Sequence, residues 1–387
     1  NRGCTSMADA EVFLHPDFTA HIHDPMKFGE MGKAVERICH AISSHEKIRV
    51  FGDYDVDGIS AVAVFLSLFR ALRVDTVDSY IPDRYAEGYG LNKGAIDAFG
   101  KEGVTLLITC DCGTSNAAEI ARARKKGIDV IIVDHHKKAE VVPEAYAILN
   151  PAFDDEPYPF PKLCSTAVAY KIATAVLRKL QYGKNMLETP LPEGWEKWLL
   201  DLVALATVAD LMPLYGENRA LVKYGLLVLK QTRRPGLTAM FASMTGDRQH
   251  LTTATIGYQI APRLNAAGRI KHATAALELL MTEDPAEAQR LAAELDQTNG
   301  ERQGLTERLF AEALEQVPKD PLPTLLAVVG NDWPSGVVGL VAGRLKERFH
   351  RPSLAIGLAG GKLTGSGRSV TGFDITRALA EASKHLA

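Results

Sequence analysis

Three aspartates stand at alternate positions in the stretch KIRVFGDYDVDGISAVAVFLSLF, residues 47–69. An apolar run rich in β-forming residues leads into Asp53, Asp55 and Asp57, and a glycine and a second apolar run follow them. Like charges this close together are costly unless a positive charge lies between them. The three carboxylates therefore either point into solvent from a turn or hold a metal ion.

The D-x-D-x-D-G spacing invites comparison with the calcium loop of an EF-hand. That loop needs a bidentate Glu at its twelfth position, which here is Val64, and a helix in front of it. Neither is present in the pattern, so we reject the EF-hand. Carboxylates combined with one or two imidazoles suit Mn²⁺ or Mg²⁺. A carboxylate shared by two ions about 3.5–4 Å apart builds a two-metal hydrolytic site, which activates water and stabilises charge on a phosphoryl centre.

The segments around these aspartates alternate between strand and helix patterns. Such alternation predicts an α/β fold, in which a parallel sheet carries helices on both of its faces. The predicted strands are 48–52, 77–82, 104–110, 128–134 and 145–151, and the predicted helices between them are 58–72, 92–102 and 115–126.

Acids and histidines follow three of these strands. The first strand ends at the three aspartates, the third ends at Asp111, and the fourth ends at 134–136, which reads Asp-His-His. Ligands of such sheets lie beyond the carboxyl ends of the strands, so these side chains are expected at one edge. Because His135 and His136 are adjacent, we expect their side chains to diverge, one toward a metal and the other toward a substrate phosphate.

A further acid stands in a strongly apolar helical pattern, WEKWLLDLVALATVADLMPL. Asp210 is surrounded there by Ala, Leu, Val and Met, where a carboxylate is expensive unless it is paired or ligated. The alternative is an acid at the end of the helix, because Pro213 follows shortly. The sequence leaves both interpretations open.

The second half of the chain predicts a separate domain. Residues 284–317 read as a long polar helix that connects two lobes, although Gly300 and Gly304 are potential breaks. Strand and helix patterns resume near residue 320 with TLLAVVG, a helix over 336–349 and PSLAIG. We therefore expect four parts: an N-terminal segment (1–47), a catalytic domain (48–215), a helical region with the connector (216–319) and a smaller α/β domain (320–387).

The composition narrows the class of protein. The 387 residues are 46% hydrophobic, which is enough for a sizeable core, and contain no run long enough to span a bilayer. The five cysteines form neither a disulfide framework nor a zinc spacing, so we expect a reduced, cytoplasmic protein without a membrane partner. The net charge of −3 does not exclude nucleic acid, because basic footprints are local. We interpret the basic stretches 122–126 and 344–351 as solvated helix faces.

Two stretches have the composition of phosphate-binding segments. APRLNAAGRI places Arg263 and Arg269 around Asn265, and arginine forks suit phosphate oxygens. GKLTGSGRSVTG is rich in glycine, which lets a backbone approach a ligand closely, and it carries Ser366 and Arg368. Trp333, Tyr85 and Tyr89 could stack on bases, but core packing or a helix staple is the simpler interpretation of each.

Taken in order, GDYDVDG, DCG, VDHH and ATVADLMPL resemble the successive motifs of the DHH phosphoesterase superfamily. RYAEGYGLN, APRLNAAGR, GVVGLVAGRLKERFHRPSLA and GSGRS resemble the RecJ family within it. The resemblance runs from about residue 48 to the end. It implies a DHH domain followed by a DHHA1 domain, and a metal-dependent exonuclease that degrades single-stranded DNA from 5′ to 3′ in recombination and repair.

The resemblance also implies roles for individual residues. Asp111 would bridge two Mn²⁺ or Mg²⁺ ions, Asp53 would stand in or next to the metal site, and His136 would contact the scissile phosphate. The implied metal ligands are Asp55, Asp57, Asp111, His135 and Asp210. The implied DNA-binding residues are Arg263, Asn265, Arg269, Ser366, Gly367 and Arg368.

The sequence departs from the family pattern in three ways. Pro334 replaces a histidine that many RecJ sequences carry after the tryptophan, and Phe51 stands where some superfamily members place a metal-binding histidine. The chain also stops at Ala387, before the family's glycine-glycine-histidine motif and its C-terminal OB-fold, so we expect a fragment with a truncated DHHA1 domain.

Two other functions remain open at this stage. One is a different DHH phosphoesterase, acting on short oligonucleotides, cyclic dinucleotides or pyrophosphate. The other is a DNA-binding scaffold without catalysis, although a scaffold would be expected to lose metal-binding acids. As partners we expect single-stranded DNA and repair proteins such as a helicase or a single-strand-binding protein, and we expect a monomer.

Overall fold

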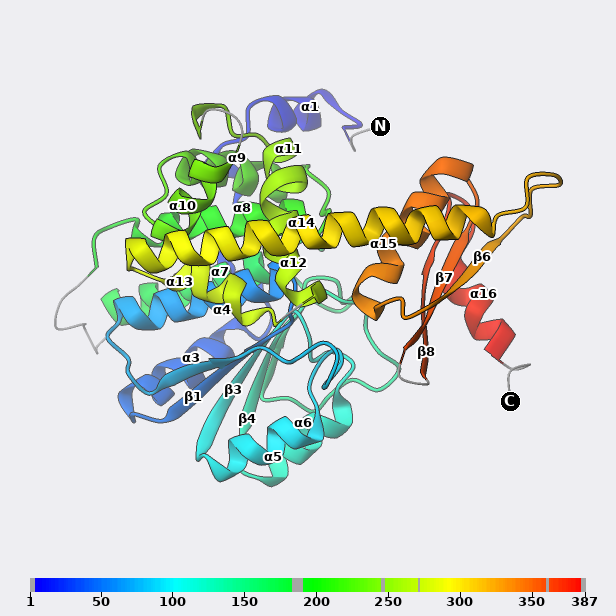
Figure 1. Ribbon diagram of the computed structural model, residues 1–387. Helices are drawn as coiled ribbons and strands as arrows, with labels where there is room; N and C mark the ends of the chain where they lie inside the picture. The colour runs from blue at the N-terminus through cyan, green and yellow to red at the C-terminus, as the bar shows by residue number, and fades with distance from the viewer. Residues whose placement is uncertain (1–3, 183–190, 245–247, 271, 360–361, 384–387) are drawn as a thin grey trace. The chain divides into compact units, whose positions relative to one another are not determined.

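The computed structural model describes residues 4–182, 191–244, 248–270, 272–359 and 362–383. By its internal contacts the chain forms two compact units (Figure 1). Unit 1 comprises residues 1–265 and 273–295, and unit 2 comprises residues 266–272 and 296–387. The chain therefore crosses between the units three times: inside helix α12 (Ala261–Ile270), between residues 272 and 273, and inside helix α14 (Pro285–Glu315).

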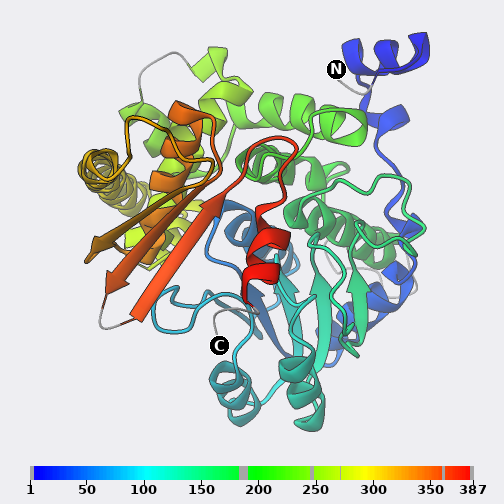
Figure 2. The same ribbon diagram turned by 90° about the vertical axis from the view of Figure 1, so that its right-hand side faces the viewer.

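Unit 1 is built on a five-stranded parallel sheet with the strand order β2-β1-β3-β4-β5. Its strands run side by side in one direction (Figure 2). The bounds are β1 (Lys47–Gly52), β2 (Val77–Tyr80), β3 (Val104–Cys110), β4 (Asp129–Val133) and β5 (Ala147–Leu149). All five predicted strands are present, and the predicted α/β class is confirmed.

Helices cover both faces of this sheet, as the continuous apolar strands require. The helices α5 (Lys93–Lys101) and α6 (Ala117–Lys125) cover one face, where Phe99 and Ile120 join a buried cluster with Phe51 and Ile132. The helices α4 (Val56–Ala71) and α7 (Ser165–Tyr182) contact the sheet from its other side.

Further helices complete unit 1. They are α1 (Met7–Leu14), α2 (Phe18–His21), α3 (Met31–Ser43), α8 (Leu200–Ala209), α9 (Gly216–Lys230), α10 (Pro235–Ser243), α11 (Thr253–Thr255) and α13 (Thr274–Met281). Short 3₁₀ turns are η1 (Pro25–Lys27), η2 (Trp195–Leu199) and η3 (Arg248–His250), and a π-helical stretch, η4, spans Ile256–Ile260. Helix α8 is almost entirely buried, which explains the apolar sequence ahead of Asp210.

Unit 2 has a three-stranded sheet of order β6-β7-β8, with β6 (Leu326–Asn331) parallel to β7 (Ser353–Ala359) and β8 (Lys362–Arg368) antiparallel to β7. Helix α15 (Ser335–Phe349) packs on this sheet, and α16 (Ile375–Ala382) follows it in the chain. Trp333 is a core residue here, since it is 1% exposed and its indole N–H donates to Glu312 Oε2 at 2.9 Å.

The boundary of unit 2 differs from the expected domain start near residue 320. Leu309, Ala313 and Val317 belong to the same buried cluster as Trp333, so the C-terminal half of α14 is part of this unit. Helix α14 itself runs for 31 residues without interruption. The potential breaks at its two glycines do not occur, because neither glycine needs a left-handed backbone there.

Candidate active site

The junction between β1 and α4 fixes the first three aspartates. Asp55 caps α4, and its Oδ1 accepts hydrogen bonds from the backbone N–H groups of Asp57 at 2.9 Å and Gly58 at 3.2 Å. A Cβ at Gly58 would lie 2.5 Å from the backbone oxygen of Asp53, so only glycine lets the helix start this close to the strand. Asp53 is buried, and within the described part of the chain its Oδ1 has no hydrogen-bond partner.

Helix α7 holds the third aspartate. The backbone N–H groups of Ser165 and Thr166 donate to Oδ2 and Oδ1 of Asp57, each at 2.8 Å, and the Thr166 hydroxyl donates to the Asp57 backbone oxygen at 2.8 Å. The unpaired N–H groups and the dipole of a helix N-terminus favour a carboxylate at this place. Asp57 is therefore fixed from both oxygens before any ligand binds.

Asp111 follows β3 with a left-handed backbone, φ +61°. A non-glycine residue adopts this conformation rarely, although aspartate does so more readily than most, and such strain often accompanies functional sites. The Ser165 hydroxyl donates to Asp111 Oδ1 at 3.2 Å. The conformation thus turns a buried carboxylate toward the start of α7.

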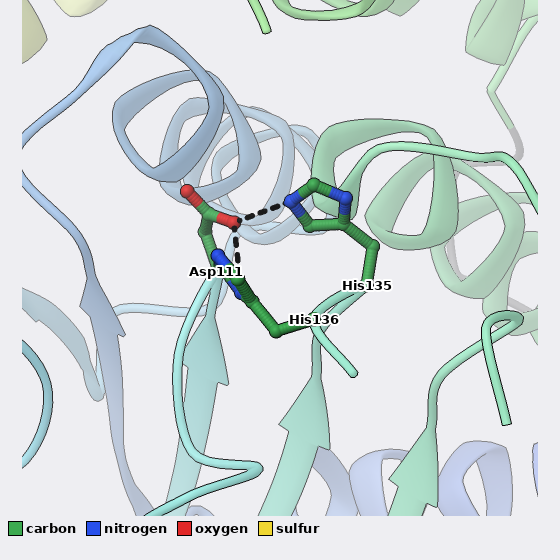
Figure 3. A group of neighbouring side chains, drawn as sticks. All are labelled: Asp111, His135 and His136. Atoms are coloured by element: carbon green, nitrogen blue, oxygen red, sulfur yellow. Dashed lines mark ion pairs between the residues drawn. The ribbon is translucent and has the colours of Figure 1, made fainter. Parts of the chain in front are cut away.

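Both histidines after β4 reach one oxygen of Asp111 (Figure 3). His135 Nε2 lies 3.1 Å and His136 Nδ1 lies 3.9 Å from Asp111 Oδ1, and the ring centroids are 4.7 Å apart. The expectation that the two side chains diverge is therefore wrong. The reason is Asp134, whose Oδ1 accepts the backbone N–H groups of His135 at 2.8 Å and His136 at 3.2 Å and so ends the extended alternation of the strand.

Asp210 joins this group from the end of α8. It occupies the C-cap position, and its Oδ2 lies 3.6 Å from His135 Nε2, which is also 3.8 Å from Asp57 Oδ2. Both interpretations of Asp210 from the sequence thus describe part of its setting: the acid ends a helix and also faces an imidazole.

Three overlapping sets of side chains have ligand atoms within 4.8 Å of one another: Asp53, Asp55 and Asp111; Asp57, His135 and Asp210; Asp111, His135 and His136.

The clustered carboxylates repel one another. Burial and the charge of Asp57 raise the pKa of Asp210 to about 7. Burial and neighbouring carboxylates also raise the pKa values of Asp53, Asp55 and Asp111. A divalent cation among these oxygens would instead lower the pKa values of the carboxylates, because it favours the ionised form of each one.

The sequence assigned no site role to two residues that contact His136, namely Asp134 and Tyr89. Asp134 Oδ1 is 2.7 Å from His136 Nδ1, and this hydrogen bond raises the pKa of His136. Burial would raise the pKa of Asp134, but hydrogen bonds from His136 and Thr114 prevail and lower it to about 2. The Tyr89 hydroxyl, assigned to core packing from the sequence, donates to the Asp111 backbone oxygen at 3.0 Å and lies 3.4 Å from His136 Nδ1.

The residues expected to hold DNA belong to different units. In unit 1, Asn265 Oδ1 accepts the backbone N–H of Val56 at 3.1 Å, and Arg263 Nη1 donates to the Gln259 backbone oxygen at 2.8 Å. In unit 2, Arg269 Nη1 donates to the Gly336 backbone oxygen at 3.0 Å.

The glycine-rich segment of unit 2 supplies the rest. Arg368 Nη1 donates to the Ser366 hydroxyl at 2.9 Å and to the Gly367 backbone oxygen at 2.8 Å. A Cβ at Gly339 of helix α15 would lie 2.8 Å from Arg368 Nη2 and 3.0 Å from Ser366 Oγ, so these side chains lie directly over that helix.

The two unusual positions have ordinary structural roles. Phe51 is fully buried and stacks on Tyr80 with ring centroids 5.6 Å apart, so it is a core residue of the sheet. Pro334 precedes α15 at its N-cap position, where a fixed φ and the missing N–H cost little.

Comparison with known proteins identifies the family of this site. The model of the DHH family, N-terminal domain, matches residues 47–207. A solved structure described as exonuclease RecJ bound to manganese superposes with a TM-score of 0.79 and 31% identity, covering 92% of this chain and 86% of that one. The chain belongs to the RecJ family.

Two further relatives support this assignment. The single-stranded-DNA-specific exonuclease RecJ of Bacillus subtilis is 41% identical over 383 residues, which are 98% of this chain and 47% of that protein. RecJ from Thermus thermophilus, solved in complex with Mn²⁺, has a TM-score of 0.79 and 30% identity over 92% of this chain and 50% of its own.

The RecJ-family chain thus spans about half the length of these two relatives. Among the helices that the structure describes, none has the length and apolar character needed to cross a membrane.

Proposed function

We propose that this chain carries the catalytic centre of a metal-dependent exonuclease that degrades single-stranded DNA from its 5′ end by phosphodiester hydrolysis, in recombination and repair. The observation that carries the proposal is the convergence of five carboxylates and two imidazoles from β1, β3, β4 and α8 on the oxygen atoms around Asp111. The Bacillus subtilis relative is named a single-stranded-DNA-specific exonuclease, and two solved RecJ structures contain manganese.

The donor set fits divalent manganese or magnesium. Asp53 Oδ1 is a buried oxygen without a hydrogen-bond partner in the described residues, which is the condition expected of an atom reserved for a cation. Oxygen donors with one or two imidazoles suit Mn²⁺, and oxygen donors suit Mg²⁺. The metal ligands would be Asp55, Asp57, Asp111, His135 and Asp210, with Asp53 beside them, and Asp111 would serve both ions because it belongs to two of the overlapping sets of ligand atoms.

When bound, the ions supply an activated water and stabilise charge on the phosphoryl centre. The chain's own residues provide the orientation. Asp134 Oδ1 accepts a hydrogen bond from the protonated Nδ1 of His136 at 2.7 Å. This hydrogen bond fixes the plane of the imidazole ring and leaves Nε2 free to donate to a phosphate oxygen. Because this contact also raises the pKa of His136, the ring is held in its cationic form at higher pH than a free histidine.

The remaining residues would hold the DNA backbone. Arginine forks bind phosphate oxygens in a bidentate way and read no base, which suits an enzyme that must accept any sequence. We assign this role to Arg263, Asn265, Arg269, Ser366, Gly367 and Arg368. The repair proteins that would act with the enzyme, its monomeric state and its cytoplasmic location stay predictions from the sequence.

A panel of substrates separates this proposal from the other DHH activities. The purified chain with Mn²⁺ is incubated with single-stranded DNA, duplex DNA, a dinucleotide, a cyclic dinucleotide or pyrophosphate, and released products are quantified. We expect mononucleotides from single-stranded DNA at a rate at least tenfold above every other substrate. A preference for the dinucleotide, the cyclic dinucleotide or pyrophosphate contradicts the proposal. Tight DNA binding without any product identifies a scaffold instead.

A further inference from the structure

A cavity of about 540 Å³ in unit 2 is lined by three arginines from three different elements. Arg302 comes from α14, Arg344 from α15 and Arg368 from the end of β8. The other charged groups of its wall are two glutamates, Glu307 and Glu347, so the wall has a surplus of positive charge. Residues 344–351 were interpreted from the sequence as a solvated helix face. Arg344 does not fit that interpretation, because it lines this cavity.

The arginines of this cavity differ from most others in their surroundings. Within the part of the chain that the structure describes, none of the three forms an ion pair with a carboxylate. The guanidinium of Arg302 donates to Asn299 Oδ1, at 3.0 and 3.2 Å, and that of Arg344 lies over the ring of Phe310 at 5.3 Å. Burial and the charge of Arg344 lower the pKa of Arg302, which means that the two like charges lie close together without compensation.

The wall is also shaped for a ligand rather than for packing. Gly343 faces open space, because a Cβ built there would have no atom within 4 Å. Gly339, one turn earlier on α15, lies against Arg368 and Ser366, so the cavity is continuous with the segment to which we assign a DNA contact. None of the described residues that line the cavity is aromatic, so these residues offer a base no stacking partner.

We infer that Arg302 and Arg344 form, together with Arg368, a second phosphate-binding subsite, which holds an internucleotide phosphate of the bound single strand. The inference rests on the proposed function for its ligand and adds to it a contact with the strand from α14 and α15. Uncompensated arginines at a polar cavity favour a phosphate group, since the guanidinium fork matches its oxygens and requires no base readout.

The test measures the affinity of the chain for a single-stranded oligonucleotide labelled at its 3′ end, by fluorescence anisotropy in chelator so that no cleavage occurs. Arg302→Ala and Arg344→Ala should each weaken binding about tenfold. Each should also reduce the slope of log K against log salt by about 0.7, the value for one phosphate contact on a single strand. The matched controls are Arg308→Ala on α14 and Arg348→Ala on α15, which lie outside the cavity and should change neither quantity.

An arginine-to-alanine change could weaken binding through lost packing rather than through a lost phosphate contact. Two further variants keep all three arginines and so avoid this effect. Gly343→Leu keeps all three arginines, fills open space and favours the helix, so it should fold well and still weaken binding. Glu347→Gln removes a negative charge from the wall and should strengthen binding.

Wild-type affinity and salt slope in Arg302→Ala, Arg344→Ala and Gly343→Leu would overturn the inference. The same holds if these variants lose only the binding of inorganic phosphate, measured by calorimetry, because the cavity would then serve a free anion. Failure of the proposed function is a different result, namely a wild-type chain that binds no single-stranded DNA or releases no nucleotide from it.

Discussion

Asp134 Oδ1 and His136 Nδ1 are 2.7 Å apart, and each changes the protonation of the other. The hydrogen bond raises the pKa of His136 and opposes the effect of burial on Asp134, whose pKa falls to about 2. A buried carboxylate that orients an imidazole and favours its charged form is the arrangement expected where that imidazole must contact an anion.

Replacing this carboxylate should move the pH dependence of the reaction. In Asp134→Asn the pKa of His136 should fall toward its ordinary value of 6.5, since the negative partner is gone. The alkaline limb of the profile of kcat/KM should therefore shift to lower pH. Asp155→Asn, which removes a surface carboxylate paired with Lys138, serves as the control. An unshifted profile in Asp134→Asn would show that His136 does not act as a cation.

Asp111→Asn should abolish hydrolysis while leaving the fold intact. Asparagine tolerates the left-handed backbone at this position, so the change removes a charge and a metal ligand without new strain. We expect a loss of at least a thousandfold in kcat/KM, which is about 4 kcal/mol of transition-state stabilisation, and an unchanged circular dichroism spectrum. Turnover within tenfold of the wild type would contradict the shared role of Asp111.

Ser165→Ala should weaken metal binding without removing any ligand. Its hydroxyl donates to Asp111 Oδ1 at 3.2 Å, and the loss of such an outer contact typically costs about 10–100-fold in metal affinity. The Mn²⁺ concentration for half-maximal activity should rise accordingly, while kcat at saturating Mn²⁺ changes less. Thr174→Ala, on the same helix but bonded to the Tyr170 backbone oxygen and to no group of the site, is the matched control among the described residues. Equal metal requirements in both variants would count against this contact.

The stability of the metal-free chain should fall as pH rises. The pKa of Asp210 is raised from 3.8 to about 7 in the folded chain, so the native state binds more protons than the unfolded state across that interval. The free energy of unfolding must then decrease with pH between those two values. In chelator, Asp210→Asn should gain stability relative to the wild type as pH rises from 4 to 7, measured by urea unfolding, and Mn²⁺ should cancel the gain. If the difference in unfolding free energy between Asp210→Asn and the wild type does not change with pH, the raised pKa of Asp210 is refuted.

The strand and helix pattern of unit 1 could be predicted because β1, β3, β4 and β5 are mainly apolar, buried strands. The topology of a parallel sheet then places Asp57, Asp111 and His135 at one edge. Asp210 could be singled out because a carboxylate is rare in an apolar helix such as α8.

Other features depend on contacts distant in sequence or on turns too local for any periodicity. The role of Ser165 follows from the position of α7 against α4 and β3, which no residue spacing encodes. The convergence of His135 and His136 depends on two backbone hydrogen bonds to Asp134. Helix α14 continues through Gly300 and Gly304 because its two ends pack on different cores, and this packing outweighs the weak helix propensity of glycine.

The most direct test of the account is a digestion of single-stranded DNA labelled at either the 5′ or the 3′ end, with Mn²⁺ or with chelator, by the wild type and by Asp111→Asn. We predict that the wild type with Mn²⁺ releases the 5′ label at once as a mononucleotide and shortens the 3′-labelled strand stepwise, and that chelator or the substitution stops both. Release of nucleotides from the 3′ end first, or equal digestion in chelator, would contradict it.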